Sequence, residues 1–192
     1  AAAARVAPAG RVFAFEPSPI LAAQLGRNAA LNSGLAITIV PAALGAAAGR
    51  ATLFDASAAF ADGSRHGGVV SLYPSDRCNV PTGEAVVTTL DRVVAEVALD
   101  QVDCIKIDVE GAELAVLQGA FATLRRFRPA LIIEVQEETS RAAGYAQREI
   151  LDLLLPLGYL FHTIGRRGRL SPLTPETLAP FQNVFCLPPT AR

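Results

Sequence analysis

The stretch Asp103-Cys-Ile-Lys-Ile-Asp-Val-Glu-Gly-Ala-Glu113 decides the fold of this chain. Its first half is an apolar run rich in β-branched residues, which predicts a buried strand from Cys104 to Val109. Gly111 then allows a sharp change of backbone direction. Glu113 suits the first turn of a helix, because its negative charge faces the positive end of the helix dipole. The stretch therefore predicts a strand that turns into a helix at Gly111.

The residues that follow continue the alternation of helix and strand. Four apolar residues recur at helical spacing before Arg128-Pro129 ends the helix, namely Leu114, Leu117, Phe121 and Leu124. Residues 130–135 form another strongly apolar strand, and a further helix ends at Gly158. Residues 159–164 and 183–187 are then expected to be two closing strands that run antiparallel.

The preceding residues show the same alternation. Residues 11–15 are a short apolar strand, and Ser18-Pro19 opens a helix because serine caps free backbone amides and proline suits the first helical position. Residues 36–40 are the next strand. The alternation predicts an α/β fold of the Rossmann-like type, with a mostly parallel sheet and helices on both faces.

Between these regions, residues 46–84 are rich in Ala, Gly, Ser and Asp, and we expect an irregular or β-rich excursion there. Weak strand signals occur at residues 51–54 and 69–72. Residues 86–90 are expected to form a strand, and Asp91 to cap the short helix after it. Because no linker or repeat divides the chain, residues 1–192 are expected to form a single domain.

The composition excludes several classes of protein. Of the 192 residues, 51% are apolar and 18% are charged, which is typical of a packed domain rather than a disordered segment. The net charge of −1 argues against nucleic acid as a partner, and no apolar run is long enough to span a membrane. Three cysteines without paired spacing are expected to be buried free thiols. We therefore expect a cytoplasmic protein with a small-molecule partner.

Acidic residues stand where the predicted strands end. They are Glu16, Asp108 with Glu110, and Glu134. Ligands of open α/β sheets bind beyond the carboxyl ends of the strands, so these residues are candidates for the site. Glu16 could accept both hydroxyls of an adenosine ribose, or it could simply help to begin the helix at Ser18. The acid alone does not separate these roles.

Charges inside the central apolar strand need a partner or a function. Lys106 and Asp108 are expected on one face of the strand and could form either a structural ion pair or part of a site. Glu134 could meet Asp108 or Glu110 across the cleft. Such carboxylates can bind a divalent cation, but no histidine lies nearby in the sequence, so we expect no metal site.

Several motifs together resemble the FkbM-type S-adenosylmethionine-dependent methyltransferases, and they follow in that family's order over nearly the whole chain. They are Val12-Phe-Ala-Phe-Glu-Pro17, Asn28, Asn32, Pro41-Ala-Ala-Leu-Gly45, Thr89-Leu-Asp91, Ile105-Lys-Ile-Asp-Val-Glu-Gly-Ala-Glu113 and Pro129-Ala-Leu-Ile-Ile-Glu134. The run from Lys106 to Glu113 is the most specific of them. The resemblance implies a Rossmann-like class I methyltransferase fold with S-adenosylmethionine as the methyl donor.

The resemblance also implies roles for individual residues. Glu16, followed by Pro17, matches the acid that holds the cofactor ribose, and Ala43 and Leu44 match the segment near the adenine. Asp108 and Glu110 match the acidic strand end beside the methyl-transfer position, where Asp108 also borders the cofactor. We expect Asp108 or Glu110 to act as general base or to orient the acceptor, with Glu134 as a second candidate. The acceptor implied is a hydroxyl on a sugar or secondary metabolite.

The front of the chain departs from the family pattern. Family members begin this domain with a strand and a glycine-rich turn that wraps the cofactor, and we expect the present chain to start after them, in the following helix. Two other functions therefore stay open. The chain could be a non-catalytic remnant or binding module of the same fold, or an NAD(P)-dependent oxidoreductase that uses Glu16 for the ribose.

Overall fold

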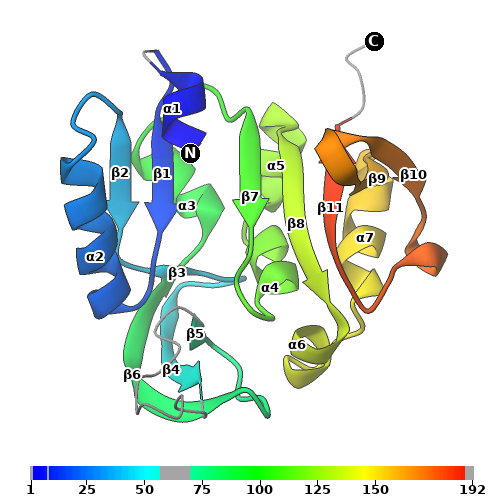
Figure 1. Cartoon of the computed structure of the whole chain (residues 1–192), viewed down its shortest axis with the longest axis horizontal. Helices are drawn as coiled ribbons and strands as arrows, with labels where there is room; N and C mark the ends of the chain where they lie inside the picture. Colours follow the sequence, from blue (N-terminus) through cyan, green and yellow to red (C-terminus); the bar gives the residue numbers. More distant parts are fainter. Residues whose placement is uncertain (1, 8, 57–69, 189–192) are drawn as a thin grey trace.

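The strand of the opening stretch belongs to a five-stranded sheet. The structure is a computed structural model that describes residues 2–7, 9–56 and 70–188 (Figure 1). In spatial order the strands are β10 (Leu170–Leu173), β9 (Leu160–Ile164), β11 (Phe181–Leu187), β8 (Ala130–Gln136) and β7 (Cys104–Ile107). β7 and β8 are parallel, whereas β8, β11, β9 and β10 pair antiparallel. The sheet is therefore mixed, and the predicted mostly parallel sheet is not confirmed.

A second, two-stranded sheet comes from the first part of the chain. β1 (Val12–Phe15) pairs in parallel with β2 (Ile37–Val40), after the short helix α1 (Ala2–Val6). The connecting helix α2 (Pro19–Ala30) begins as predicted, with Pro19 in its first turn and the Ser18 hydroxyl accepting a hydrogen bond from the Leu21 amide. The carboxyl ends of β1 and β7 point to the same edge of the molecule (Figure 1).

The excursion and the residues on either side of it form a separate four-stranded sheet. Its order is β3 (Ala43–Leu44), β6 (Cys78–Thr88), β4 (Gly49–Ala56) and β5 (Val70–Ser71). The segment expected to be irregular or β-rich contributes strands to this sheet, and its residues 57–69 lie outside the described residues. β6 begins well before the predicted residue 86, and its pairing with β4 shifts register near Leu53. Pro81 and Gly83 in β6 conceal this strand in the sequence.

The helices correct two predictions. The remaining helices are α3 (Leu90–Glu96), α4 (Glu113–Gln118), α5 (Phe121–Phe127), α6 (Glu137–Ala142) and α7 (Arg148–Leu154). Short 3-10 turns follow, η1 (Leu155–Leu157), η2 (Arg166–Gly168) and η3 (Pro175–Thr177). Thr89, not Asp91, caps α3, and Asp91 instead accepts hydrogen bonds from the Ala122 and Thr123 amides. The single helix predicted after Glu113 is broken into α4 and α5 at Gly119.

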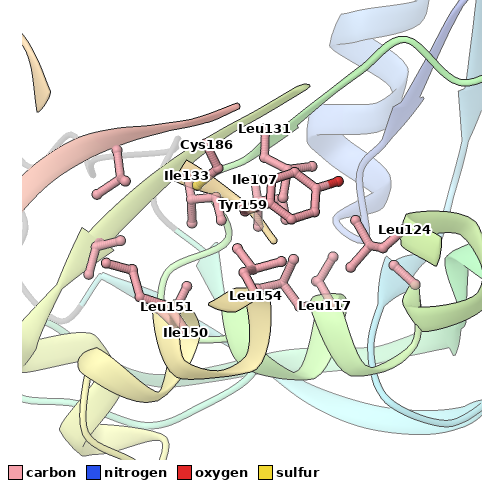
Figure 2. Close-up of a cluster of buried hydrophobic side chains, with 14 of the residues drawn as sticks. Ile107, Leu117, Leu124, Leu131, Ile133, Ile150, Leu151, Leu154, Tyr159 and Cys186 are labelled. Atoms are coloured by element: carbon pink, nitrogen blue, oxygen red, sulfur yellow. The ribbon is translucent and has the colours of Figure 1, made fainter. Parts of the chain in front are cut away.

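The core lies between the five-stranded sheet and the helices on one of its faces (Figure 2). From β7 and β8, Ile107, Leu131 and Ile133 are fully buried against Leu117 of α4 and Leu154 of α7. The alternate residues of β8 face the other way and are only partly buried. Helices on both faces of this sheet are thus not confirmed for the described residues.

The cysteines and the lengths of the helices bear on two further expectations. Cys78 and Cys186 are buried free thiols, but Cys104 is exposed because it starts the edge strand β7. Among the described residues, every helix is too short or too polar to cross a membrane.

Candidate functional site

Three carboxylates meet beside the carboxyl end of β7 and the carboxyl-terminal half of β8. The parallel register sets Ile107 opposite Ile133, so Asp108 and Glu134 each follow one residue later on neighbouring strands. Glu110 joins them from the turn after β7. Oxygens of Asp108, Glu110 and Glu134 all lie within 4.8 Å of one another, and we call these three residues the acidic cluster. The structure thus brings together the three residues predicted to carry catalysis.

The three negative charges change how the acidic cluster holds protons. Burial, followed by the charges of Asp108 and Glu134, raises the pKa of Glu110 above its ordinary value. Burial and Asp108 also raise the pKa of Glu134, while Lys106 partly opposes this. Lys106 forms an ion pair with Asp108 at the exposed end of the strand. An ion pair was one of the two roles expected for these charges. Glu110 and Glu134 therefore take up protons more readily than ordinary carboxylates.

The turn that carries Glu110 has an unusual backbone. Glu110 has a φ of 51° and Gly111 a φ of 105°, both in the region that favours glycine. A Cβ at Gly111 would also lie 2.8 Å from the carbonyl oxygen of Thr139, so α6 packs directly on this turn. Gly111 is therefore required both for its conformation and for its size, and the predicted change of direction is confirmed.

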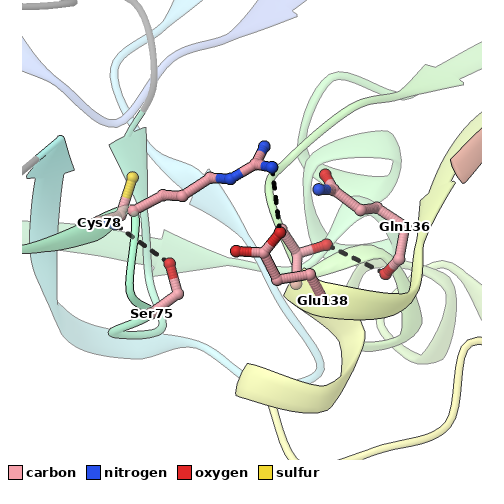
Figure 3. A network of polar contacts seen from close by, with 6 residues as sticks. Ser75, Cys78, Gln136 and Glu138 are labelled. Carbon is pink, nitrogen blue, oxygen red and sulfur yellow. Dashed lines mark hydrogen bonds and ion pairs between the residues drawn. The ribbon is translucent and has the colours of Figure 1, made fainter. Parts of the chain in front are cut away.

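The excursion is tied to the same turn. The Ser71 hydroxyl donates a hydrogen bond to the carbonyl oxygen of Glu110 at 2.7 Å, and it accepts one from the Tyr73 amide at 3.0 Å. Farther along, Arg77 forms a 3.3 Å ion pair with Glu138 of α6. Figure 3 shows Glu138 facing the segment that carries Ser75 and Cys78. Sequence reasoning missed these contacts, because no local pattern pairs a residue of the excursion with one of α6.

The residues predicted to bind the cofactor lie at the ends of other strands. Glu16 and Pro17 follow β1 and are half-buried, and the Ser18 amide donates a 2.8 Å hydrogen bond to Oε1 of Glu16. Ala43 and Leu44 form β3, which pairs with the end of β6. Among the described residues, no hydrogen bond or ion pair joins Glu16 to the acidic cluster.

These positions differ in what they can bind. The Glu16 carboxylate is fixed by Ser18 through one oxygen and suits a pair of ribose hydroxyls. Ala43 is buried and Leu44 is partly buried against the core. The acidic cluster supplies the oxygens that hard divalent cations prefer. The same oxygens can equally accept the proton of a hydroxyl group.

Two cavities lie away from the acidic cluster. One, of about 660 Å³, is formed around the connection between α6 and α7, and Tyr145 is part of its wall. The other, of about 370 Å³, lies beside β9 and β10. Neither is lined by a residue predicted for the site. Asp108 is exposed and Glu110 and Glu134 are half-buried, so solvent reaches the acidic cluster.

Comparison with known proteins identifies the family. Residues 1–161 match the family model described as the methyltransferase FkbM domain. One similar solved structure is the methyltransferase FkbM from Methylobacillus flagellatus KT, with 20% sequence identity and a TM-score of 0.49. That match covers 92% of this chain and 36% of the other, so the chain spans about a third of that protein's length. No curated protein gave a significant match. By the extent of the family match, the chain belongs to the FkbM methyltransferase domain family and is a methyltransferase by resemblance.

Proposed function

We propose that this domain transfers a methyl group from S-adenosylmethionine to a hydroxyl oxygen of a sugar or secondary metabolite. The observation that carries the proposal is the acidic cluster, in which Glu110 and Glu134 have raised pKa values at the ends of adjacent parallel strands. We further propose a Rossmann-like class I arrangement for β1, β2, β7 and β8. The parallel pairing of β1 with β2 and of β7 with β8 supports it.

The donor side of the proposed site is the end of β1. S-adenosylmethionine would supply a methyl group bound to a positively charged sulfur. Glu16 would hold its ribose through two hydrogen bonds, with the Ser18 amide fixing the direction of the carboxylate. Ala43 and Leu44 would border the adenine, and Asp108 would approach the donor from β7. The half-buried position of Glu16 favours this role, since a carboxylate shielded from water binds hydroxyls more strongly.

The acidic cluster would act on the acceptor. As the hydroxyl oxygen forms its bond to the methyl carbon, the bond from that carbon to sulfur breaks, and the hydroxyl proton passes to a carboxylate. Glu110 suits this step because its raised pKa makes it a stronger base than an ordinary glutamate. Asp108, paired with Lys106, would orient the hydroxyl. Glu134 is the second candidate for the base.

The excursion would form the wall that selects the acceptor. Ser71 and Arg77 attach it to the turn at Glu110 and to α6, so its residues border the acidic cluster. Binding specificity commonly resides in such connecting segments, which a rigid sheet holds in place. The acceptor is thus expected to be a small molecule that contacts both the excursion and the turn.

The proposal can be tested by methyl transfer. The purified protein is incubated with S-adenosylmethionine labelled in its methyl group and with a panel of glycosides and hydroxylated aromatic compounds. The expected result is that the label appears in a methyl ether formed from one class of these compounds. Methyl transfer only to amines or thiols would contradict the proposal. So would the absence of any methyl transfer together with reduction of added NAD(P) by a hydroxylated compound.

A further inference from the structure

A buried carboxylate stands behind the turn of the acidic cluster. Glu113, in the first turn of α4, is only 3% exposed. A buried charge is unfavourable unless hydrogen bonds compensate it. Glu113 has three such bonds: its Oε1 accepts from the amides of Val109 and Gly111, and its Oε2 accepts from the hydroxyl of Tyr145. Both oxygens are thus engaged, and two of the three donors belong to the turn.

The turn requires such support because its backbone is unfavourable. Glu110 has a positive φ, which costs free energy in any residue with a side chain, and such conformations persist only where surrounding contacts hold them. The amides held by Glu113 flank Glu110, at 3.3 Å for Val109 and 3.1 Å for Gly111. The position of the Glu110 carboxylate is therefore tied to that of Glu113.

Tyr145 fixes the other side of Glu113. It lies between α6 and α7, packs against the core, and donates its hydroxyl to Glu113 at 3.0 Å. Burial and the charge of Glu113 raise the pKa of Tyr145 above its ordinary value, so the phenol keeps its proton and stays a donor. The Tyr145 side chain thereby links the connection between α6 and α7 to the turn after β7.

We propose that Glu113 and Tyr145 are positioning residues that hold residues 108–111 in the conformation that sets Asp108 and Glu110 opposite Glu134. Neither is expected to touch the acceptor or the donor. That this turn is where the methyl group is transferred rests on the proposed function. The mechanical part of the inference, that Tyr145 orders the turn through Glu113, stands on the hydrogen bonds alone.

Matched substitutions separate positioning from a general loss of stability. Tyr145→Phe removes the donor to Glu113. Tyr159→Phe is its control, because Tyr159 also donates its hydroxyl to a buried oxygen, the carbonyl of Pro129 at 2.9 Å. Glu113→Gln removes the charge but retains an oxygen for the amides. Its control is Glu149→Gln, since Glu149 accepts from the Ala146 amide at 2.8 Å at an exposed position.

The first measurement is amide hydrogen exchange by NMR on the full protein without ligands. We expect Tyr145→Phe to accelerate exchange at Val109 and Gly111 about tenfold, the effect of weakening one hydrogen bond network. Tyr159→Phe should leave these two amides unchanged. Equal exchange at Val109 and Gly111 in the two variants would overturn the inference.

The second measurement is the titration of the Glu110 carboxyl carbon by NMR. Because the charge of Glu113 is among those that raise the pKa of Glu110, Glu113→Gln should shift this titration toward its ordinary value, and Glu149→Gln should not. A global change in stability does not move a side-chain titration in the folded state. An unchanged Glu110 titration in Glu113→Gln would contradict the proposed coupling, and this variant serves if Tyr145→Phe folds poorly.

A third measurement distinguishes this inference from the proposed function. Once an acceptor is known, Tyr145→Phe should lower kcat about tenfold or more while KM for S-adenosylmethionine changes little, since Glu16 and not the turn holds the donor ribose. Altered exchange at the turn with unchanged kcat would keep the mechanical link but reject the turn as the reaction site. Unchanged exchange would reject the link, whatever the methyl-transfer assay gives.

Discussion

The hydroxyl of Ser71 lies 2.7 Å from the carbonyl oxygen of Glu110 and donates a hydrogen bond to it. These residues are 39 positions apart, one in the excursion and the other in the acidic cluster. Ser71 is only 4% exposed, so water cannot replace its hydroxyl. The bond makes the excursion and the turn after β7 one structural unit.

Ser71→Ala should loosen this unit. Removing a buried donor leaves the Glu110 carbonyl without its partner, and we expect a loss of about 1–3 kcal/mol in the free energy of unfolding, measured with urea. Ser75→Ala is the control, because Ser75 accepts a hydrogen bond from the Cys78 amide within the excursion and does not touch the turn. Only Ser71→Ala should shift the NMR resonances of residues 108–111. Equal shifts in both variants would mean that Ser71 has no special link to the turn.

The raised pKa of Glu110 predicts how stability varies with pH. The folded state holds the proton on Glu110 to a higher pH than the unfolded state does, so this group destabilises the fold as pH rises from its ordinary pKa to its raised one. Glu110→Gln removes this effect. We expect its Tm to exceed that of the original protein at pH 8 and the difference to shrink toward pH 4. A constant difference across this range would contradict the assigned shift.

Methyl transfer should depend on the acidic cluster. Asp108→Asn and Glu110→Gln are each expected to reduce kcat by about 10²–10⁴-fold, the usual contribution of a general base. Asp152→Asn, which removes the partner of Arg148 at the surface of α7, should leave kcat unchanged. The assay follows release of S-adenosylhomocysteine in the presence of the acceptor. Full activity in both cluster variants would exclude them as base and orienting group.

The break between α4 and α5 predicts a sensitive glycine. A Cβ at Gly119 would lie 2.0 Å from the carbonyl oxygen of Gly45, which follows the β3 segment assigned to the adenine. Gly119→Ala should therefore destabilise the protein by about 1–3 kcal/mol and weaken donor binding. Gly34→Ala, where nothing lies within 4 Å of the added atom, should change stability by about 0.5 kcal/mol or less. Similar unfolding curves for the two variants would contradict the close packing.

The sequence predicted the elements that depend on local signals. The cap at Ser18, the apolar strands β7 and β8, and the turn at Gly111 follow from neighbouring residues, and the structure contains them. The helix break at Gly119 was missed, although a glycine is a common helix end and Gly119 caps α4. Its close approach to Gly45, 74 positions earlier, has no signal in the sequence. β6 was only partly predicted, since Pro81 and Gly83 resemble a turn when its partner β4 is unknown.

The same distinction applies to the candidate site. Asp108, Glu110 and Glu134 could be chosen because acids at adjacent strand ends meet wherever the strands are parallel neighbours. Glu113 was assigned only to its helix terminus, although a charge between Ala112 and Leu114 hinted at a buried partner. Nothing in the sequence indicates that Ser71 and Tyr145 contact this region, because both contacts form only in the folded chain.

The most direct test of the account is calorimetry with S-adenosylmethionine on the protein that carries this domain. We predict one-site binding that Glu16→Gln weakens about tenfold or more, because a charge-assisted hydrogen bond to the ribose is lost. Glu84→Gln, which affects only the exposed ion pair with Arg50, should bind as the original protein does. Binding of NAD in place of S-adenosylmethionine, or equal affinity in Glu16→Gln, would contradict the account.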